Sequence, residues 1–115
     1  ANRADEIMVS TCDIDEDVAQ LIREGRLTSS AGAHWMLGGF GLIMLHDYMH
    51  GFEPIERQPA FPLIVVTQNN VDRYVEAFLN GLPYTDEEIR QLSKVYNPEA
   101  NVVEELENLY LTWDE

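Results

Sequence analysis

The sequence predicts an α/β protein in which a parallel β-sheet is flanked by helices, in the order βαβαβα. Three observations lead to this fold class. Extended segments are indicated at 7–9, 27–33 and 61–67, each bounded by small polar residues or turn residues. Each one is followed by a segment whose apolar side chains recur at helical spacing. Strands that alternate with helices in this way pair in parallel through right-handed crossovers.

The first element is a strand–helix–strand unit over 7–35. The apolar run 7–9 stops at small polar residues, and Asp13 follows at the carboxyl end of the predicted strand. Asp13 and Glu16 have the spacing of a capping box, with Asp13 as the N-cap. Gly25 occupies the position of a left-handed C-cap. Polar side chains therefore collect at strand ends, which is the edge where open α/β sheets bind ligands.

The second helix is predicted over 36–51 and is apolar on nearly every side. A helix of this kind is expected to pack against neighbours on more than one side. Gly38, Gly39 and Gly41 each lower its helix propensity by about 1 kcal/mol relative to alanine. We expect them to allow a close backbone approach, either to a strand or to a ligand. The proline-bearing segment 52–59 then forms a loop.

The run FPLIVVT at 61–67 is continuous and rich in β-branched residues, as in strands that are buried on both faces of a parallel sheet. Asn69 or Asn70 is expected to cap the helix that follows, over 71–79. These elements complete an α/β segment that we assign to residues 1–80.

Residues 81–115 form a helical acidic extension. Thr85 and Glu88 make a second capping box that opens a helix, and an Asn-Pro pair at 97–98 ends it. From Asp86 onward the chain has nine acidic residues and two basic ones. The apolar residues over 102–113 are sufficient for a further helix that docks on the remainder of the chain.

Composition limits the partners. The 115 residues suit one small domain, and the net charge of −14 argues against nucleic acid or an anionic membrane as a partner. The lone Cys12 allows no internal disulfide and is expected to be a small buried residue rather than a reactive thiol. No stretch has the length and apolarity of a membrane span or a signal peptide. The polar start without an initiator Met led us to expect that the chain is a fragment.

Four stretches carry a family resemblance. They are IMVSTCD at 7–13, LIREGRL at 21–27, GGFGLIMLHDYMHG at 38–51 and PLIVVTQNNVDRY at 62–74. In this order and at this spacing they resemble the C-terminal portion of the sugar-binding proteins of ABC transporters. This is the periplasmic binding protein type 1 group, which includes ribose-binding proteins. The usual Gly-Phe before the aspartate is Thr11-Cys12 here, which leaves the sugar unidentified.

The resemblance implies a two-lobed protein that closes on a sugar or polyol between its lobes. The chain would be part of the C-terminal lobe, together with the final crossing to the N-terminal lobe. The implied partners are the small-molecule ligand, the N-terminal lobe of the same protein, and an ABC permease or membrane sensor. The implied location is the periplasm, and no cofactor is expected.

The resemblance also implies the ligand-binding residues. Asp13 matches the family's ligand carboxylate, which accepts hydrogen bonds from vicinal hydroxyl groups. His34 falls within one residue of a polar ligand contact, and Trp35 could stack on a sugar ring. Each has a structural alternative, since Asp13 could be only an N-cap, His34 a loop or core histidine, and Trp35 a packing residue.

Other functions remain open at this point. His46 and His50 lie one helical turn apart, as in some zinc sites, although no third ligand is evident and a solvent-facing pair explains them equally. An effector domain of a sugar-responsive repressor, or a sugar sensor that signals to a membrane receptor, would share the fold. No Ser/His/Asp order, Cys/His pair or phosphate-binding loop is present, so we predict that the chain is not an enzyme.

Overall fold

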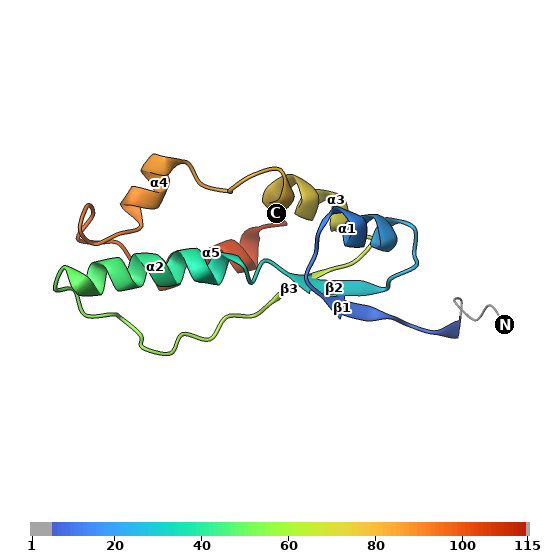
Figure 1. The fold of residues 1–115 in the computed structure, drawn as a ribbon, viewed down its shortest axis with the longest axis horizontal. Helices are drawn as coiled ribbons and strands as arrows, with labels where there is room; N and C mark the ends of the chain where they lie inside the picture. Colours follow the sequence, from blue (N-terminus) through green and yellow to red (C-terminus); the bar gives the residue numbers. More distant parts are fainter. Residues whose placement is uncertain (1–5, 115) are drawn as a thin grey trace. The chain divides into compact units, whose positions relative to one another are not determined.

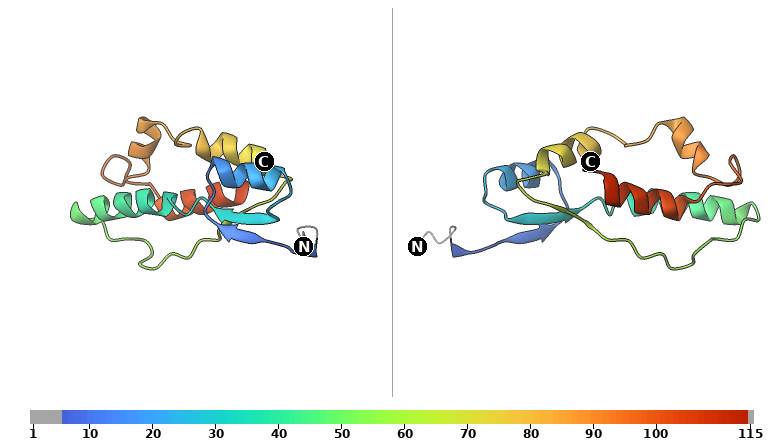
Figure 2. Two further views of the ribbon diagram at one scale, coloured as in Figure 1. Left: turned by 45° about the vertical axis from the view of Figure 1, so that its right-hand side comes forward. Right: turned by 180° about the vertical axis from the view of Figure 1, so that it is seen from behind.

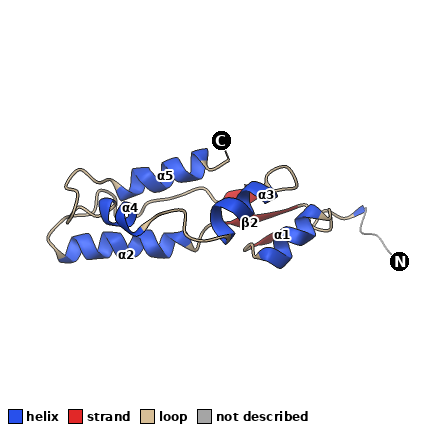
Figure 3. Cartoon of the chain, turned by 90° about the horizontal axis from the view of Figure 1, so that it is seen from above, coloured by secondary structure: helices blue, strands red, loops and turns tan. Residues whose placement is uncertain are grey.

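The computed structural model describes residues 6–114 as an α/β chain with a three-stranded mixed sheet and helices (Figures 1 and 3). The chain divides into two compact units. The first contains the described residues up to His34 together with 63–82 and Asp114, and the second contains 35–62 and 83–113. The predicted α/β class is confirmed, and each unit is described by itself below.

The first unit contains the sheet. Its elements are β1 (Ser10–Cys12), α1 (Glu16–Arg23), β2 (Ser29–Gly32), β3 (Ile64–Val66), α3 (Val71–Tyr74) and the π-helical turn η2 (Val75–Leu79). The second unit contains α2 (Met36–Met49), α4 (Asp86–Gln91) and α5 (Val102–Thr112). The predicted alternation of strands and helices is therefore present, although β2 and β3 are shorter than the segments 27–33 and 61–67 that suggested them.

The strand order is β1-β2-β3, with one parallel and one antiparallel pairing. β1 pairs with β2 in parallel, and β2 pairs with β3 in the antiparallel direction, with Gly32 opposite Ile64. The sheet is therefore mixed rather than wholly parallel. The burial of β3 agrees with this pairing: Ile64 and Val66 are buried while Val65 between them is 58 % exposed, so the described residues cover one face of the strand and not both, as was predicted. One covered face is typical of an antiparallel strand.

Helices α1 and α3 lie on the same face of this sheet (Figures 1 and 2). Ser30, Gly32, Ile64 and Val66 alternate along β2 and β3 and point to that face, where they are buried. The apolar residues that complete this core are Ile14, Ala19, Ile22, Val71, Tyr74 and Phe78. The first unit thus buries a small core between one sheet face and two helices.

The start of α1 differs from the prediction. Asp15, not Asp13, is the N-cap, and its carboxylate accepts a hydrogen bond of 2.8 Å from the Val18 N–H. Asp15 has the extended backbone that an N-cap requires, whereas Asp13 has a φ of 74° and lies before the helix. Gly25 follows the helix with a φ of 69°, as the left-handed C-cap prediction expects.

The strand at the N-terminal side is also shifted. β1 occupies 10–12 rather than the apolar run 7–9, and the side chains of that run are exposed. Apolar character therefore did not mark the paired residues here. Cys12, which was expected to be a small buried residue, is exposed in this strand. Pairing with β2 begins at Ser10, opposite Ser29, and the two hydroxyl oxygens lie 2.8 Å apart.

In the second unit, α5 packs on α2 through one face of each helix. The buried residues of this packing are Met36, Phe40, Val102, Val103, Leu106 and Tyr110. The Phe61 ring stands edge-on to the Tyr110 ring, with centroids 6.2 Å apart. The other side of α2 is not covered by described residues, since Leu42, Leu45 and Met49 are largely exposed.

The expected close approach of the α2 glycines to a strand is not seen among the described residues. A Cβ added to Gly38, Gly39 or Gly41 would meet no atom of the described residues within 4 Å. The helix ends at Met49, two residues before the predicted end, and Gly51 follows with a φ of 91°. Its apolar surface therefore exceeds what the described residues cover.

The helix caps in the second half were predicted in part. Thr85 and Glu88 form the expected capping box at the start of α4. Asn70 stands at the N-cap position of α3, but its side chain bonds to the backbone of Thr67 and Val65 instead of capping the helix. Within residues 6–114, no helix has the length and apolarity needed to cross a membrane.

Candidate functional site

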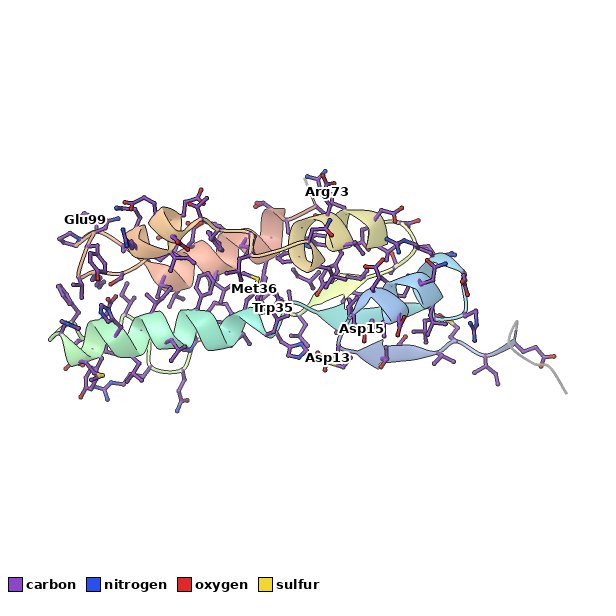
Figure 4. The ribbon with its side chains drawn as sticks, turned by 45° about the horizontal axis from the view of Figure 1, so that its top comes forward. Asp13, Asp15, Trp35, Met36, Arg73 and Glu99 are labelled. Atoms are coloured by element: carbon purple, nitrogen blue, oxygen red, sulfur yellow. The ribbon has the colours of Figure 1, made fainter. Side chains whose placement is uncertain are left out.

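The carboxyl ends of the parallel strands β1 and β2 meet at one edge of the sheet, where Asp13 and His34 lie. Figure 4 shows Asp13 at the end of β1, beside the start of α1. The His34 Nε2 atom is 2.9 Å from the Asp13 Oδ1 atom. The Asp13 side chain is 81 % exposed and that of His34 is 34 % exposed. A carboxylate at hydrogen-bonding distance from an imidazole is thus presented to solvent at the edge where such sheets bind ligands.

The backbone has a rare conformation at Asp13 itself and at the residue that precedes His34. Asp13 has a φ of 74° and Ala33, which precedes His34, has a φ of 65°. The left-handed region costs a residue with a Cβ about 1–2 kcal/mol, and aspartate tolerates it better than alanine does. Strained residues of this kind gather at functional sites. Two strained residues at adjacent strand ends therefore indicate that this edge of the sheet is a candidate functional site.

The conformation of Asp13 is held by β2. The Asp13 N–H donates to the Ala31 carbonyl at 2.9 Å, and the Ser30 hydroxyl donates to the Asp13 carbonyl at 2.7 Å. Ser30 is buried, so this hydroxyl is shielded from competing water. Both peptide groups that flank the Asp13 Cα atom are therefore tied to one neighbouring strand.

The conformation of Ala33 is held by a tyrosine from a distant part of the chain. The Ala33 N–H donates to the Tyr74 hydroxyl oxygen at 2.9 Å, and both residues are buried. Gly32 makes this approach possible, because a Cβ there would clash with the Tyr74 hydroxyl and with the Ile14 side chain. A buried hydrogen bond contributes about 0.5–1.5 kcal/mol, which is comparable with the strain that it offsets.

The environment of His34 favours one neutral tautomer. Its Nδ1 atom is buried and has no hydrogen-bond partner among the described residues. A proton on Nε2 allows donation to Asp13 and leaves Nδ1 as a bare acceptor, which is less costly than a buried N–H without an acceptor. Within residues 6–114, His34 is the one side chain paired with the Asp13 carboxylate, so the second carboxylate oxygen is available to a ligand.

The structure thus brings two of the three predicted site residues together. Asp13 is not the N-cap of α1, which removes the structural alternative for that residue. Trp35, the third, belongs to the second unit, where it precedes α2 and is 43 % exposed. Sequence reasoning missed Ser30, Ala33 and Tyr74. The one available signal was Tyr74, because a tyrosine on a buried helix face needs a partner for its hydroxyl.

The histidine pair on α2 has a different setting. The His46 and His50 rings lie with centroids 4.4 Å apart, and His50 Nδ1 is 2.8 Å from the His46 carbonyl. No group of three or more potential metal ligands occurs among the described residues. His46 instead stacks on Tyr96, with the two ring planes 5° apart. The pair is therefore part of a surface aromatic cluster.

The second unit also has an open concavity of about 460 Å³ between α4 and α5. Tyr84 lies in it, and burial, followed by the Glu105 and Glu88 carboxylates, raises the pKa of this phenol to about 12. Glutamate and asparagine side chains form much of the remaining wall. The chemistry is acidic and polar, with no strained backbone beside it.

Comparison of this chain with protein-family models, with curated proteins and with solved structures found no match.

Proposed function

We propose that this chain is part of a solute-binding protein of an ABC transport system that binds a sugar or polyol, with Asp13 and His34 as ligand contacts. The observation that carries the proposal is the Asp13–His34 pair, which stands on two strained and hydrogen-bonded backbone positions at the carboxyl ends of parallel strands. The sequence resemblance supplies the ligand class, the permease as partner and the periplasm as location.

The chemistry of the pair suits hydroxyl groups. A carboxylate accepts hydrogen bonds from vicinal hydroxyls, and such charge-assisted bonds are stronger than neutral ones. One Asp13 oxygen faces His34, which orients the carboxylate, and the other is open. Because the backbone is already held in place, little ordering cost remains for ligand binding. An anionic sugar would be repelled, since the contact carboxylate brings negative charge into a chain with a net charge of −14.

Uncovered surfaces support the proposal that a larger protein surrounds this chain. The outer edge of β1 pairs with no strand of the described residues, and Ile7, Met8 and Val9 beside it are exposed. A further strand of the same lobe would cover that edge. The chain also leaves the first unit after His34 and re-enters it at Leu63. In this proposal the apolar face of α2 packs on the N-terminal lobe.

Thermal-shift and calorimetric titrations of the full-length protein with pentoses, hexoses and polyols test this function. One ligand class is expected to raise the melting temperature, and Asp13→Asn is expected to abolish the rise. Glu56→Gln is the matched control, because it makes the same carboxylate-to-amide change at an exposed loop position. Absence of any response across the panel, or equal binding by Asp13→Asn, would refute the proposed function.

A further inference from the structure

We propose that Tyr74 is a positioning residue of this site: its hydroxyl holds Ala33 in the left-handed conformation and so aims His34 at Asp13. The inference rests on the proposed function for the role of the pair in binding a solute. Tyr74 touches neither site side chain in this proposal, and it acts through the backbone of Ala33.

The geometry around Tyr74 connects α3 to the end of β2. Tyr74 is fully buried, and its hydroxyl oxygen accepts from the Ala33 N–H across 41 positions of sequence. Gly32 precedes Ala33 and lacks the Cβ that would clash with this hydroxyl. Of the two residues before His34, Gly32 leaves room for the tyrosine hydroxyl and Ala33 donates a hydrogen bond to it.

Packing alone would not need the hydroxyl. The next aromatic residue along the helix, Phe78, fills the same core without one, and the two ring centroids lie 5.1 Å apart. The Tyr74 hydroxyl goes instead to a backbone N–H in a strained residue that adjoins the site. If Ala33 relaxed to a negative φ, the chain would enter His34 in a different direction, and the 2.9 Å contact with Asp13 would be lost.

The backbone at Asp13 is also bonded to a buried hydroxyl group, as the backbone at Ala33 is. The buried Ser30 hydroxyl donates to the Asp13 carbonyl at 2.7 Å. Two buried hydroxyl groups, from β2 and α3, therefore fix the two backbone segments that carry the ligand contacts. Ser30 supports the aspartate and Tyr74 supports the histidine.

The test is NMR of the histidine ring nitrogens in the ligand-free full-length protein, at a pH where imidazole is neutral. We expect His34 to be the Nε2-protonated tautomer, with its signals assigned through the loss of a peak in His34→Gln. Tyr74→Phe is expected to shift these signals toward the tautomer mixture of a solvated imidazole. Tyr110→Phe removes a hydroxyl from another buried ring, in the second unit, and is expected to leave them unchanged. Unchanged His34 signals in a folded Tyr74→Phe protein would overturn the proposal.

A rescue experiment separates positioning from packing. Glycine adopts a positive φ without the penalty of a Cβ, so Ala33→Gly is expected to restore the His34 signals in the Tyr74→Phe background. If Tyr74 acted only by filling space, Ala33→Gly would not restore them. Ala33→Gly alone is expected to keep the signals, which gives a result even if Tyr74→Phe does not fold. Loss of the His34 signals in folded Ala33→Gly would contradict a backbone held at a positive φ, since glycine adopts that conformation freely.

Ligand-binding measurements distinguish a failure of the positioning role of Tyr74 from a failure of the proposed solute-binding function. For any sugar that binds the wild type, Tyr74→Phe is expected to weaken binding about five- to tenfold, as for the loss of one hydrogen bond. If no sugar binds while the NMR changes occur as expected, the positioning role stands and the solute-binding function fails. If a sugar binds Tyr74→Phe and wild type equally and the His34 signals are unchanged, the positioning role fails alone.

Discussion

The buried Ser93 hydroxyl donates a hydrogen bond of 2.5 Å to the buried Asp47 carboxylate of α2. The second oxygen of that carboxylate accepts from the Lys94 N–H at 2.9 Å. A buried carboxylate is tolerated only when hydrogen bonds replace its water, and both of its oxygens are bonded here. Asp47 therefore ties α2 to the segment that follows α4.

Removing that carboxylate takes away the acceptor of the buried Ser93 hydroxyl and of the partly buried Lys94 N–H. Asp47→Ala is expected to lower the free energy of unfolding by about 2–3 kcal/mol, and Ser93→Ala by about 1 kcal/mol, measured by urea denaturation. Glu87→Ala, at an exposed position of α4, is the control and should change little. A loss below about 0.5 kcal/mol for Asp47→Ala would show that this carboxylate does not anchor the segment.

The left-handed backbone at Asp13 can be measured with two variants that both lack the carboxylate. Asp13→Gly is expected to be more stable than Asp13→Ala by about 1 kcal/mol, because only alanine meets the Cβ penalty at a φ of 74°. Both variants are expected to lose sugar binding. Equal unfolding free energies for the pair would mean that this conformation is not strained in the folded protein.

Gly32 and Gly39 should respond in opposite ways to the same substitution. Gly32→Ala places a methyl group against the Tyr74 hydroxyl and the Ile14 side chain, and we expect it to cost about 1–3 kcal/mol of stability. Gly39→Ala meets no described atom within 4 Å inside α2 and is expected to stabilise the protein by about 0.5–1 kcal/mol. Thermal denaturation of the two variants beside wild type decides this. A destabilising Gly39→Ala would indicate that another part of the protein lies against that helix face.

Tyr84 is expected to ionise late in an alkaline titration. Burial, with smaller contributions from the Glu105 and Glu88 carboxylates, raises the pKa of its phenol from 10 to about 12. The folded state retains this proton where the unfolded state releases it, so the contribution to stability is intact below about pH 10 and is lost as the pH rises toward 12. Ultraviolet absorbance of ionised tyrosine should show a late component that Tyr84→Phe removes. Ionisation of every tyrosine near pH 10 would contradict this.

Local chemistry predicted much of the fold. Gly25 at the end of α1 and the Thr85–Glu88 box at the start of α4 were located correctly, because each depends on residues next to one another in the chain. The N-cap of α1 was misplaced because Asp13 and Asp15 both precede the helix. Only the backbone angles, left-handed at one and extended at the other, decide between them.

Features that depend on residues far apart in the sequence were harder to predict. The run containing β3 has no residue that reveals its direction, and only the exposure of Val65 shows that one face is open. Asp13 and His34 were both expected as site residues from the family resemblance, and the ends of the parallel strands bring their side chains together. The bond from Ala33 to Tyr74 spans 41 positions and ends on a backbone N–H, so no side-chain pattern marks it.

In the proposed site, the bond between Tyr74 and Ala33 belongs to the residues that fix the backbone, which are distinct from the two side chains proposed to contact the ligand. Side chains at positions 13 and 34 can change while Ser30, Gly32 and Tyr74 keep the strand ends in place. If the pair binds a solute as proposed, single substitutions at these two positions are expected to change the ligand preference without a new fold. At this edge of the sheet, the side chains at positions 13 and 34 are therefore expected to be exchangeable, whereas Ser30, Gly32 and Tyr74, which fix the backbone, are not.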